Sequence, residues 1–484
     1  MKSTLLRTGL LALALWWPML PVEAAAPEDP LVPSAERALT AAGRYAADHL
    51  GVLGTYVWQY SLDGGIRRGE GGIVSPSVGW VQPPGTPAVG AAFLRIFEVT
   101  ADRHWLNAAA DVAKALTGTQ LLSGGWFYLI ETDPKERRSW CYRADMRRSD
   151  CREVKENANR NKTVLDDNNS QSVLNFLMWY DRESDHADPA VADAIRFGLK
   201  RIMRMQYPNG AVPVFFDTNQ PGDNVVAAPT ASLPASWQHD WQKPQTPPYF
   251  IVNDDLPRDT GRLFLNAYHL YGVAQYRETA IRIGDFLLSA QLPAPQSGWA
   301  QQYDRTMQPV WGRVFEPPAL TSKETAGSID YLIDLFVETG EAKYLKAANS
   351  AADWLKATRL PDGTWSRYYE LGSNRPMYVD ENNSVTFEPV NLLDHYNLRG
   401  TFDIPAVLDR LEKATSGETV TPSPLWISAA DRLTGTDLAA NVKGLIARQD
   451  PSGRWVSNGW IDGATFVDGV FALSRFLDEA ETAP

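Results

Sequence analysis

Two short runs of acidic and amide residues stand where helices are expected to begin. Asp166-Asp167-Asn168-Asn169 precedes one apolar periodicity typical of a helix, and Asn253-Asp254-Asp255 precedes another. Helix capping needs only one side chain of each run, and capping alone is the alternative interpretation. The spare carboxylates are the ligand type that calcium takes, so we expect Asp166, Asp167 and Asp254 to form a metal site.

Basic residues that could bind a carboxylate follow later in the chain. Arg313 and Glu316 lie in the stretch 311–318, where Arg313 could grip a carboxylate in two parallel hydrogen bonds or form a structural pair with Glu316. The stretch 365–376 carries two more arginines among aromatic residues. The candidate substrate-binding residues are Arg313, Glu316 and Glu324, and the candidate catalytic residues are Lys323, Arg367 and Arg375.

The elements that must position these residues are helices joined by a recurring turn. The turn is a Gly/aromatic phrase that closes each long helical interval, as in Gly125-Trp126, Gly298-Trp299 and Asp362-Gly363-Thr364-Trp365. Such a repeat predicts an all-α fold, an (α/α) toroid of helical hairpins with a central groove and its turns at one end. Indole rings at that end could stack on sugar faces, so Trp126, Trp299 and Trp311 are candidate substrate-binding residues.

The apolar periodicity predicts helices in pairs, each pair an antiparallel hairpin. Short polar breaks such as Gly340-Glu341 separate the two members of a pair. The predicted pairs are 87–100 with 103–116, 169–180 with 191–205, 258–271 with 277–289, 322–339 with 342–357, and 437–448 with 465–480.

Composition excludes several classes of protein. The formal charge of −12 disfavours nucleic acid and anionic membranes, although a local basic patch or a bound cation still permits an acidic substrate. Lys2 and Arg7, the apolar run 10–20 and the small-residue site at 22–24 predict a signal peptide over residues 1–24. We therefore expect a secreted or periplasmic protein without a membrane anchor, a monomer formed by a single domain over residues 25–484.

Two stretches interrupt the helical rhythm. Residues 127–165 are rich in charge, and residues 217–248 are rich in Pro, Gln and Trp. Loops of this length are uncommon unless functional, so we expect them at the rim of the groove, with mobile surface decoration as the alternative. Cys141 and Cys151 are the only cysteines, and export favours a disulfide between them.

The order of several phrases resembles the family 10 polysaccharide lyases, the pectic acid lyases. The resemblance covers about residues 85–385, with residues 386–484 as extra helices. The phrases are Gln206-Tyr207-Pro208-Asn209-Gly210, Asn253-Asp254-Asp255, Trp299 to Asp304 running into Pro309 to Glu316, Ser322-Lys323-Glu324-Thr325-Ala326-Gly327, and Arg367 with Asn374-Arg375-Pro376.

This resemblance implies calcium-assisted β-elimination of polygalacturonate in a toroid groove. By motif, Asp166 and Asp254 match the groove carboxylates of the family, with Asp167 beside the first, and Arg313 and Arg367 match its substrate-binding basic residues. The chain departs from the family at Asn169-Ser170, where the family has Ala-Thr, and at Gln308, where it often has Lys. An arginine that the family carries shortly after the position of Arg375, associated with its catalytic base, falls here near Asp380-Glu381.

Elimination from a uronate requires loss of the C5 proton, which is acidic enough only when the adjacent C6 carboxylate is neutralised. Calcium or Arg313 could supply that neutralisation, and Arg375, Arg367, Lys323 or Tyr368 could then act as the base. A rival reading is a toroid glycoside hydrolase that uses Asp254 with Glu316, or Asp166 with Glu324. A third is a secreted sugar-binding protein without chemistry. No glycine-rich phosphate loop, HExxH motif or nucleophile elbow is present in the sequence.

Overall fold

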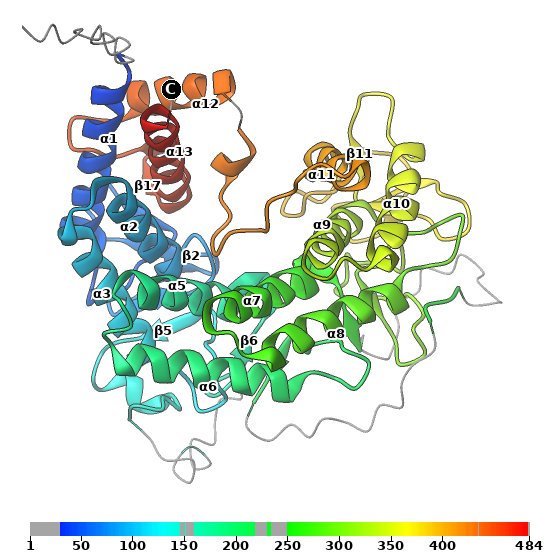
Figure 1. Ribbon diagram of the computed structural model, residues 1–484, viewed down its shortest axis with the longest axis horizontal. Helices are drawn as coiled ribbons and strands as arrows, with labels where there is room; N and C mark the ends of the chain where they lie inside the picture. The colour runs from blue at the N-terminus through cyan, green and yellow to red at the C-terminus, as the bar shows by residue number, and fades with distance from the viewer. Residues whose placement is uncertain are drawn as a thin grey trace, which may run out of the picture.

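Two concentric rows of helices form the body of the molecule (Figure 1). The computed structural model describes residues 30–145, 151, 159–217, 230–233, 249–433 and 435–482, so the predicted signal peptide lies outside the described residues. The outer row is α1 (Val32–Tyr45), α3 (Arg103–Gly118), α6 (Pro189–Met205), α8 (Ala274–Ala290), α10 (Ala342–Ala357) and α12 (Gly435–Arg448). The inner row is α2 (Thr86–Thr100), α5 (Asn169–Glu183), α7 (Leu256–Tyr271), α9 (Ser322–Thr339), α11 (Ile404–Ser416) and α13 (Gly463–Glu481).

The predicted fold class is confirmed, and the predicted hairpins match described helices to within a few residues. The bounds of α9 and α10 are those predicted, and Gly340 ends α9 in the left-handed conformation. Two helices, α1 and α11, were not among the predicted pairs. The signal for α11 is present but short, because Ile404, Val407, Leu411 and Ala414 form one buried stripe on a helix of only 13 residues.

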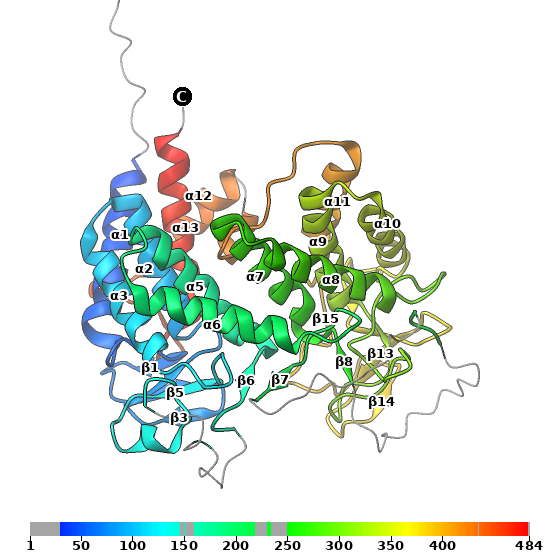
Figure 2. The same cartoon turned by 60° about the horizontal axis from the view of Figure 1, so that its bottom comes forward.

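Short antiparallel strands gather at one end of the helices, the lower end in Figure 2. One sheet has the order β16-β17-β1-β2-β3, and another has the order β10-β12-β13-β14. The strands of the first are β16 (Val456–Ser457), β17 (Trp460–Asp462), β1 (Gln59–Ser61), β2 (Arg67–Gly69) and β3 (Gly72–Val74), and those of the second are β10 (Leu320–Thr321), β12 (Tyr368–Tyr369), β13 (Pro376–Val379) and β14 (Val385–Thr386). The two-stranded pairs are β4 (Val78–Trp80) with β5 (Leu129–Glu131), β6 (Thr163–Val164) with β7 (Phe215–Phe216), β8 (Phe250–Ile251) with β9 (Gln302–Tyr303), and β11 (Trp365–Ser366) with β15 (Arg399–Gly400).

The tryptophan of the recurring turn serves the fold. Each indole N–H donates to a carbonyl oxygen near the end of the preceding outer helix: Trp126 to Leu116 at 2.9 Å, Trp299 to Leu287 at 2.8 Å, Trp365 to Leu355 at 2.7 Å and Trp455 to Leu445 at 2.9 Å. These bonds satisfy carbonyls that a helix end leaves free. Trp126 and Trp299 have no exposed surface and Trp311 is 4 % exposed, so the expectation that they stack on sugars is wrong.

At four of the turns a glutamine joins neighbouring outer helices. The side-chain amide of Gln120 donates to Ala194 on α6, that of Gln206 to Thr279 on α8, and that of Gln291 to Ala347 on α10. Gln449, after α12, donates in the same way to Ala38 on α1. Because α13 also packs against α1 and α2, the last unit of the chain adjoins the first.

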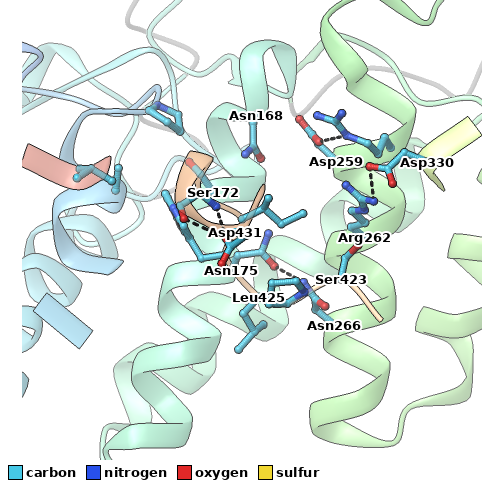
Figure 3. Close-up of a pocket in the computed structure, with 18 of the residues that line it drawn as sticks. Asn168, Ser172, Asn175, Asp259, Arg262, Asn266, Asp330, Ser423, Leu425 and Asp431 are labelled. Atoms are coloured by element: carbon cyan, nitrogen blue, oxygen red, sulfur yellow. Dashed lines mark hydrogen bonds and ion pairs between the residues drawn. The ribbon is translucent and has the colours of Figure 1, made fainter. Parts of the chain in front are cut away.

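The segment 417–433 runs from α11 to α12 and crosses the interval between α11 and α13, as the orange trace in Figure 1 shows. It closes a cavity of about 710 Å³ against the inner helices α2, α5, α7, α9, α11 and α13. Figure 3 shows amide and carboxylate side chains converging in this cavity, among them Asn175, Asn266 and Asp330. This cavity lies at the centre of the inner helices, but none of the metal-ligating, catalytic or substrate-binding residues predicted from the sequence lines it.

Two further features bear on the sequence predictions. Cys141 and Cys151 form the predicted disulfide, with their Cα atoms 5.4 Å apart. Parts of both irregular stretches, residues 146–150, 152–158, 218–229 and 234–248, lie outside the described residues. Among the helices that the structure describes, none is both long and apolar enough to cross a bilayer.

Candidate active site

The acidic runs form two equivalent turns, each directly before an inner helix. The 3-10 turn Asp166–Asn168 precedes α5, and the 3-10 turn Asn253–Asp255 precedes α7. Each turn ends in two consecutive left-handed residues, with φ of 49° and 55° in the first and 50° and 60° in the second. Asp and Asn tolerate this conformation better than most residues, and the turn frees their side chains from helix capping. Neither turn shows a side-chain cap hydrogen bond to its helix.

Asp166, Asp167 and Asp254 meet between these turns. One carboxylate oxygen from each lies within 4.8 Å of the other two. Asp166 accepts a hydrogen bond of 2.9 Å from the Tyr128 hydroxyl, whereas Asp167 has no hydrogen bond or ion pair with any described residue. The structure therefore brings the three predicted metal ligands together.

Asp166, Asp167 and Asp254, called the acidic triad below, repel one another. Burial, followed by the charges of Asp166 and Asp254, raises the pKa of Asp167 to about 7. Burial and the charge of Asp254 also raise the pKa of Asp166, although the Tyr128 hydrogen bond opposes that shift. Both pKa shifts indicate that a proton or a cation placed between these carboxylates would stabilise them.

Arg313 lies at the Asp254 side of the triad. Its Nη2 is 3.5 Å from Asp254 Oδ2 and 2.5 Å from Glu316 Oε1, and its backbone N–H donates to Glu316 Oε2. The Arg313 side chain is 51 % exposed, whereas that of Glu316 is 4 % exposed. Glu316 thus holds an arginine whose outer face remains open to a bound molecule.

Arg367 is buried behind the triad. Its Nη2 donates to Glu324 Oε1 at 2.7 Å and lies 3.6 Å from Asp254 Oδ1. Both side chains are nearly inaccessible, at 4 % for Arg367 and 0 % for Glu324. Lys323 is more exposed, at 27 %, and its Nζ lies 3.4 Å from both Asp254 and Asp255.

These ion pairs weigh against two of the predicted bases. Burial lowers the pKa of Arg367, but Glu324, Tyr396, Tyr368 and Asp254 together outweigh burial and raise the pKa above its usual range. Burial likewise lowers the pKa of Lys323, and Asp255, Glu324 and Asp254 together raise it further than burial lowers it. Both groups are held as cations in the metal-free protein, a state in which neither accepts a proton.

Arg375, the third predicted catalytic residue, lies apart from the triad. Its guanidinium carbon is 3.7 Å from the centre of the Phe387 ring, with Arg375 directly before β13 and Phe387 directly after β14. No contact between described residues joins Arg375 to the triad or to Arg313.

Three polar residues that were not among the predicted site residues, Asn253, Gln301 and Tyr396, connect the groups of the site by hydrogen bonds. Gln301 donates to Asn253 Oδ1 at 2.7 Å and to the Tyr396 hydroxyl at 3.0 Å, and Tyr396 donates to Glu316 at 3.2 Å. The Tyr396 ring also faces the guanidinium of Arg367 at 4.2 Å. Asn253 and Gln301 lie inside phrases already singled out by sequence, but Tyr396 lies beyond them and no local pattern marked it.

The donor set fits a hard divalent cation. Asp166, Asp167, Asp254, Asp255, Glu316 and Glu324 provide six carboxylates, against four cations in Arg258, Arg313, Lys323 and Arg367. Oxygens within 4.8 Å of one another can share one ion, because calcium takes oxygen ligands at about 2.3–2.6 Å. A cation would remove the excess of negative charge and the repulsion that raises the pKa of Asp167.

The fold is that of the (α/α) toroid enzymes that act on carbohydrates. A family 76 glycoside hydrolase from Bacteroides thetaiotaomicron matches with a TM-score of 0.50 and 12 % identity, over 93 % of this chain and 78 % of that one. A second family 76 enzyme, a mannosidase from the same organism, matches with a TM-score of 0.50 and 12 % identity, over 94 % of this chain and 100 % of that one.

The sequence is related more narrowly to lyases. The family model for pectic acid lyase matches residues 273–364, a segment that contains Arg313, Glu316, Lys323 and Glu324. A variant of a family 10 polysaccharide lyase from Cellvibrio cellulosa, in complex with trigalacturonic acid, has 14 % identity and a TM-score of 0.46, over 68 % of this chain and 97 % of that one. No curated protein sequence matches this chain. The family match supports a carbohydrate-active enzyme distantly related to the polysaccharide lyases.

Proposed function

We propose that the protein is a polyuronate lyase that cleaves a pectate-like acidic polysaccharide by β-elimination outside the cytoplasm. The observation that carries this proposal is the convergence of Asp166, Asp167 and Asp254 with the partly exposed Arg313. Elimination requires the C6 carboxylate of the substrate to be neutralised before the C5 proton can leave. The family match over residues 273–364 supports the same reaction class.

Asp166, Asp167 and Asp254 would hold calcium in this enzyme. When bound, calcium neutralises the substrate carboxylate as a Lewis acid and cancels the repulsion of the acidic site for an acidic polymer. Arg313 contributes the second positive charge. Its parallel N–H groups can donate to a substrate carboxylate, while Glu316 pairs with the side of the guanidinium that faces the protein. Arg367, which is paired with Glu324, contacts Asp254 and Asn253 from the buried side of the site.

The test is the growth of ultraviolet absorbance from unsaturated products. Pectate, alginate and a glycosaminoglycan are each incubated with the full-length protein, with calcium and with a chelator. We expect absorbance growth on at least one uronide, its loss with the chelator, and its loss in Asp254→Asn. Reducing ends released without absorbance, or no product from any of the three polymers, would contradict the proposal.

One observation favours a second candidate, a glycoside hydrolase. Asp167, whose pKa is raised to about 7, lies in a cluster whose carboxylate oxygens are within 4.8 Å of one another, near the separation of about 5–5.5 Å used by retaining glycosidases. In that reading Asp167 is the acid and Asp254, paired with Lys323 and Arg313, is the nucleophile. This candidate predicts reducing ends without absorbance, and activity that a chelator does not change.

A further inference from the structure

An exposed aromatic ring, Phe215, and a lysine that pairs with no carboxylate of the described residues, Lys162, lie close to the acidic triad. Phe215 is 38 % exposed, the only phenylalanine among the large apolar side chains that are exposed in the described part of the chain. Lys162 Nζ lies 5.3 Å from the centre of the Phe215 ring, and no described carboxylate pairs with this lysine. The exposed part of the ring is an apolar surface that a ligand can cover.

The local fold fixes this pair next to the site. Val164 of β6 is paired with Phe215 of β7, and the backbone N–H of Leu165 donates to the Val214 carbonyl. Since successive strand residues face opposite sides, Phe216 is buried in the core while Phe215 faces outward. Lys162 directly precedes β6, and Asp166 lies two residues after the end of that strand.

An aromatic contact connects the pair to the triad. The Tyr128 ring meets the Phe215 ring edge-on, with centroids 6.5 Å apart, and the Tyr128 hydroxyl donates to Asp166. A comparable group lies at the Asp254 side, where the Arg313 guanidinium is 5.0 Å from the Phe315 ring and 5.5 Å from the Tyr396 ring. The triad is therefore flanked by a cation with an aromatic ring at the Asp166 side and by another at the Asp254 side.

We infer that Phe215 and Lys162 form a subsite for one uronate residue of a chain that crosses the triad. A pyranose presents C–H groups that suit an aromatic surface, and a uronate adds a carboxylate that suits an ammonium group. With Arg313 receiving a uronate at the other side, the substrate extends past the triad in both directions. This inference rests on the proposed function.

Affinity electrophoresis of the full-length protein tests the subsite by binding instead of turnover. Native gels contain calcium with polygalacturonate, with neutral mannan, or with no polymer. We expect Phe215→Ala and Lys162→Ala each to weaken retardation by polygalacturonate about 3- to 10-fold, and Lys162→Arg to restore most of it. The matched control is Phe197→Ala on α6, where Arg143 lies 3.9 Å from the ring centre, and it should bind as the wild type does.

Three outcomes would overturn the subsite: a wild type that polygalacturonate does not retard, variants retarded as strongly as the wild type, or a Phe215→Ala loss that is equal on mannan while Lys162→Ala loses nothing. Absorbance assays on the same proteins separate this inference from the proposed reaction. Retardation that depends on Phe215 and Lys162 without absorbance growth rejects elimination and keeps the subsite. Absorbance growth with unchanged retardation of the variants rejects the subsite and keeps elimination.

Discussion

Asp167 shows how a single carboxylate links stability to the proposed metal site. Its pKa is raised from 3.8 to about 7, mainly by burial, so the folded metal-free protein binds a proton there more tightly than the unfolded chain does. Stability contributed by this group is therefore fully present below about pH 4 and is lost as the pH rises toward 7. Above that range the loss is complete and no longer depends on pH.

Asp167→Asn should stabilise the metal-free protein at pH 8 by about 1–3 kcal/mol, because it removes an unfavourable charge and Asn accepts the same left-handed backbone. The difference should shrink steadily toward pH 4. Thermal unfolding in a chelator across that pH range measures both effects. A difference that stays constant with pH would contradict the assignment, and added calcium should stabilise the wild type more than the variant.

The two arginines should respond differently to substitution. Arg367→Met leaves Glu324 buried without its partner and should cost about 3–5 kcal/mol of unfolding free energy. Arg313→Gln should cost less, about 1–2 kcal/mol, because half of the side chain is in solvent and Glu316 keeps its hydrogen bonds from Asn253, Tyr396 and the backbone N–H of residue 313. It should nevertheless abolish most polyuronate turnover. Denaturant unfolding and absorbance assays on both variants provide the comparison. Equal losses of stability would show that Arg313 is structural as well.

Sequence could predict the convergence of the triad, because Asp166, Asp167 and Asp254 precede helices that occupy equivalent places in successive repeats. Arg313 was found by chemical type and resemblance. Tyr396 could not be found, since its contact with Arg367 and Glu316 depends on the path of a long loop after β14. The contact of Arg375 with Phe387 is equally non-local.

At the scale of the element, the recurring Gly/Trp turn joins four of the outer helices, α3, α8, α10 and α12, to the next inner one. The phrase predicted the turn correctly but not the orientation of its ring. An aromatic residue at a turn can face a ligand or complete the core, and only the distance to the preceding helix decides between them. The indole bond from Trp365 to Leu355 illustrates the second case.

Trp365→Phe should lower the free energy of unfolding by about 2–3 kcal/mol, because it frees a buried helix carbonyl and leaves part of the indole volume empty. Trp460→Phe is the control, since this indole is only half-buried and should cost less than about 1 kcal/mol. Chemical denaturation with the slope held in common measures both. A smaller cost at Trp365 than at Trp460 would argue against a capping role.

At the scale of the whole molecule, the helices after residue 385 are not an appendage to a lyase-like core. α13 packs against α1 and α2, and Gln449 bonds to α1 as the other turn glutamines bond to their neighbours. One apolar core runs from Ala35 to Leu477. The sequence could not reveal this closure, because α1 was not predicted and a repeat alone does not say which unit meets the first.

Removal of residues 418–484 should therefore prevent folding, because it exposes the apolar faces that α1 and α2 turn toward α13. Circular dichroism and size-exclusion chromatography of the shortened protein test this, against an intact protein that unfolds in one transition. A soluble, cooperatively folded fragment would restore the view of the C-terminal helices as an addition.

The contact between α1 and α13 brings the beginning and the end of the folded chain side by side, as Figure 2 shows at the upper end of the molecule. A short flexible linker could join them, and the polypeptide could then be cut open at another exposed connection, such as the bend at Gly340. Such a circular permutant would keep every helix in place while the order of synthesis changes. The fold therefore does not depend on which helix of the arrangement comes first in the chain.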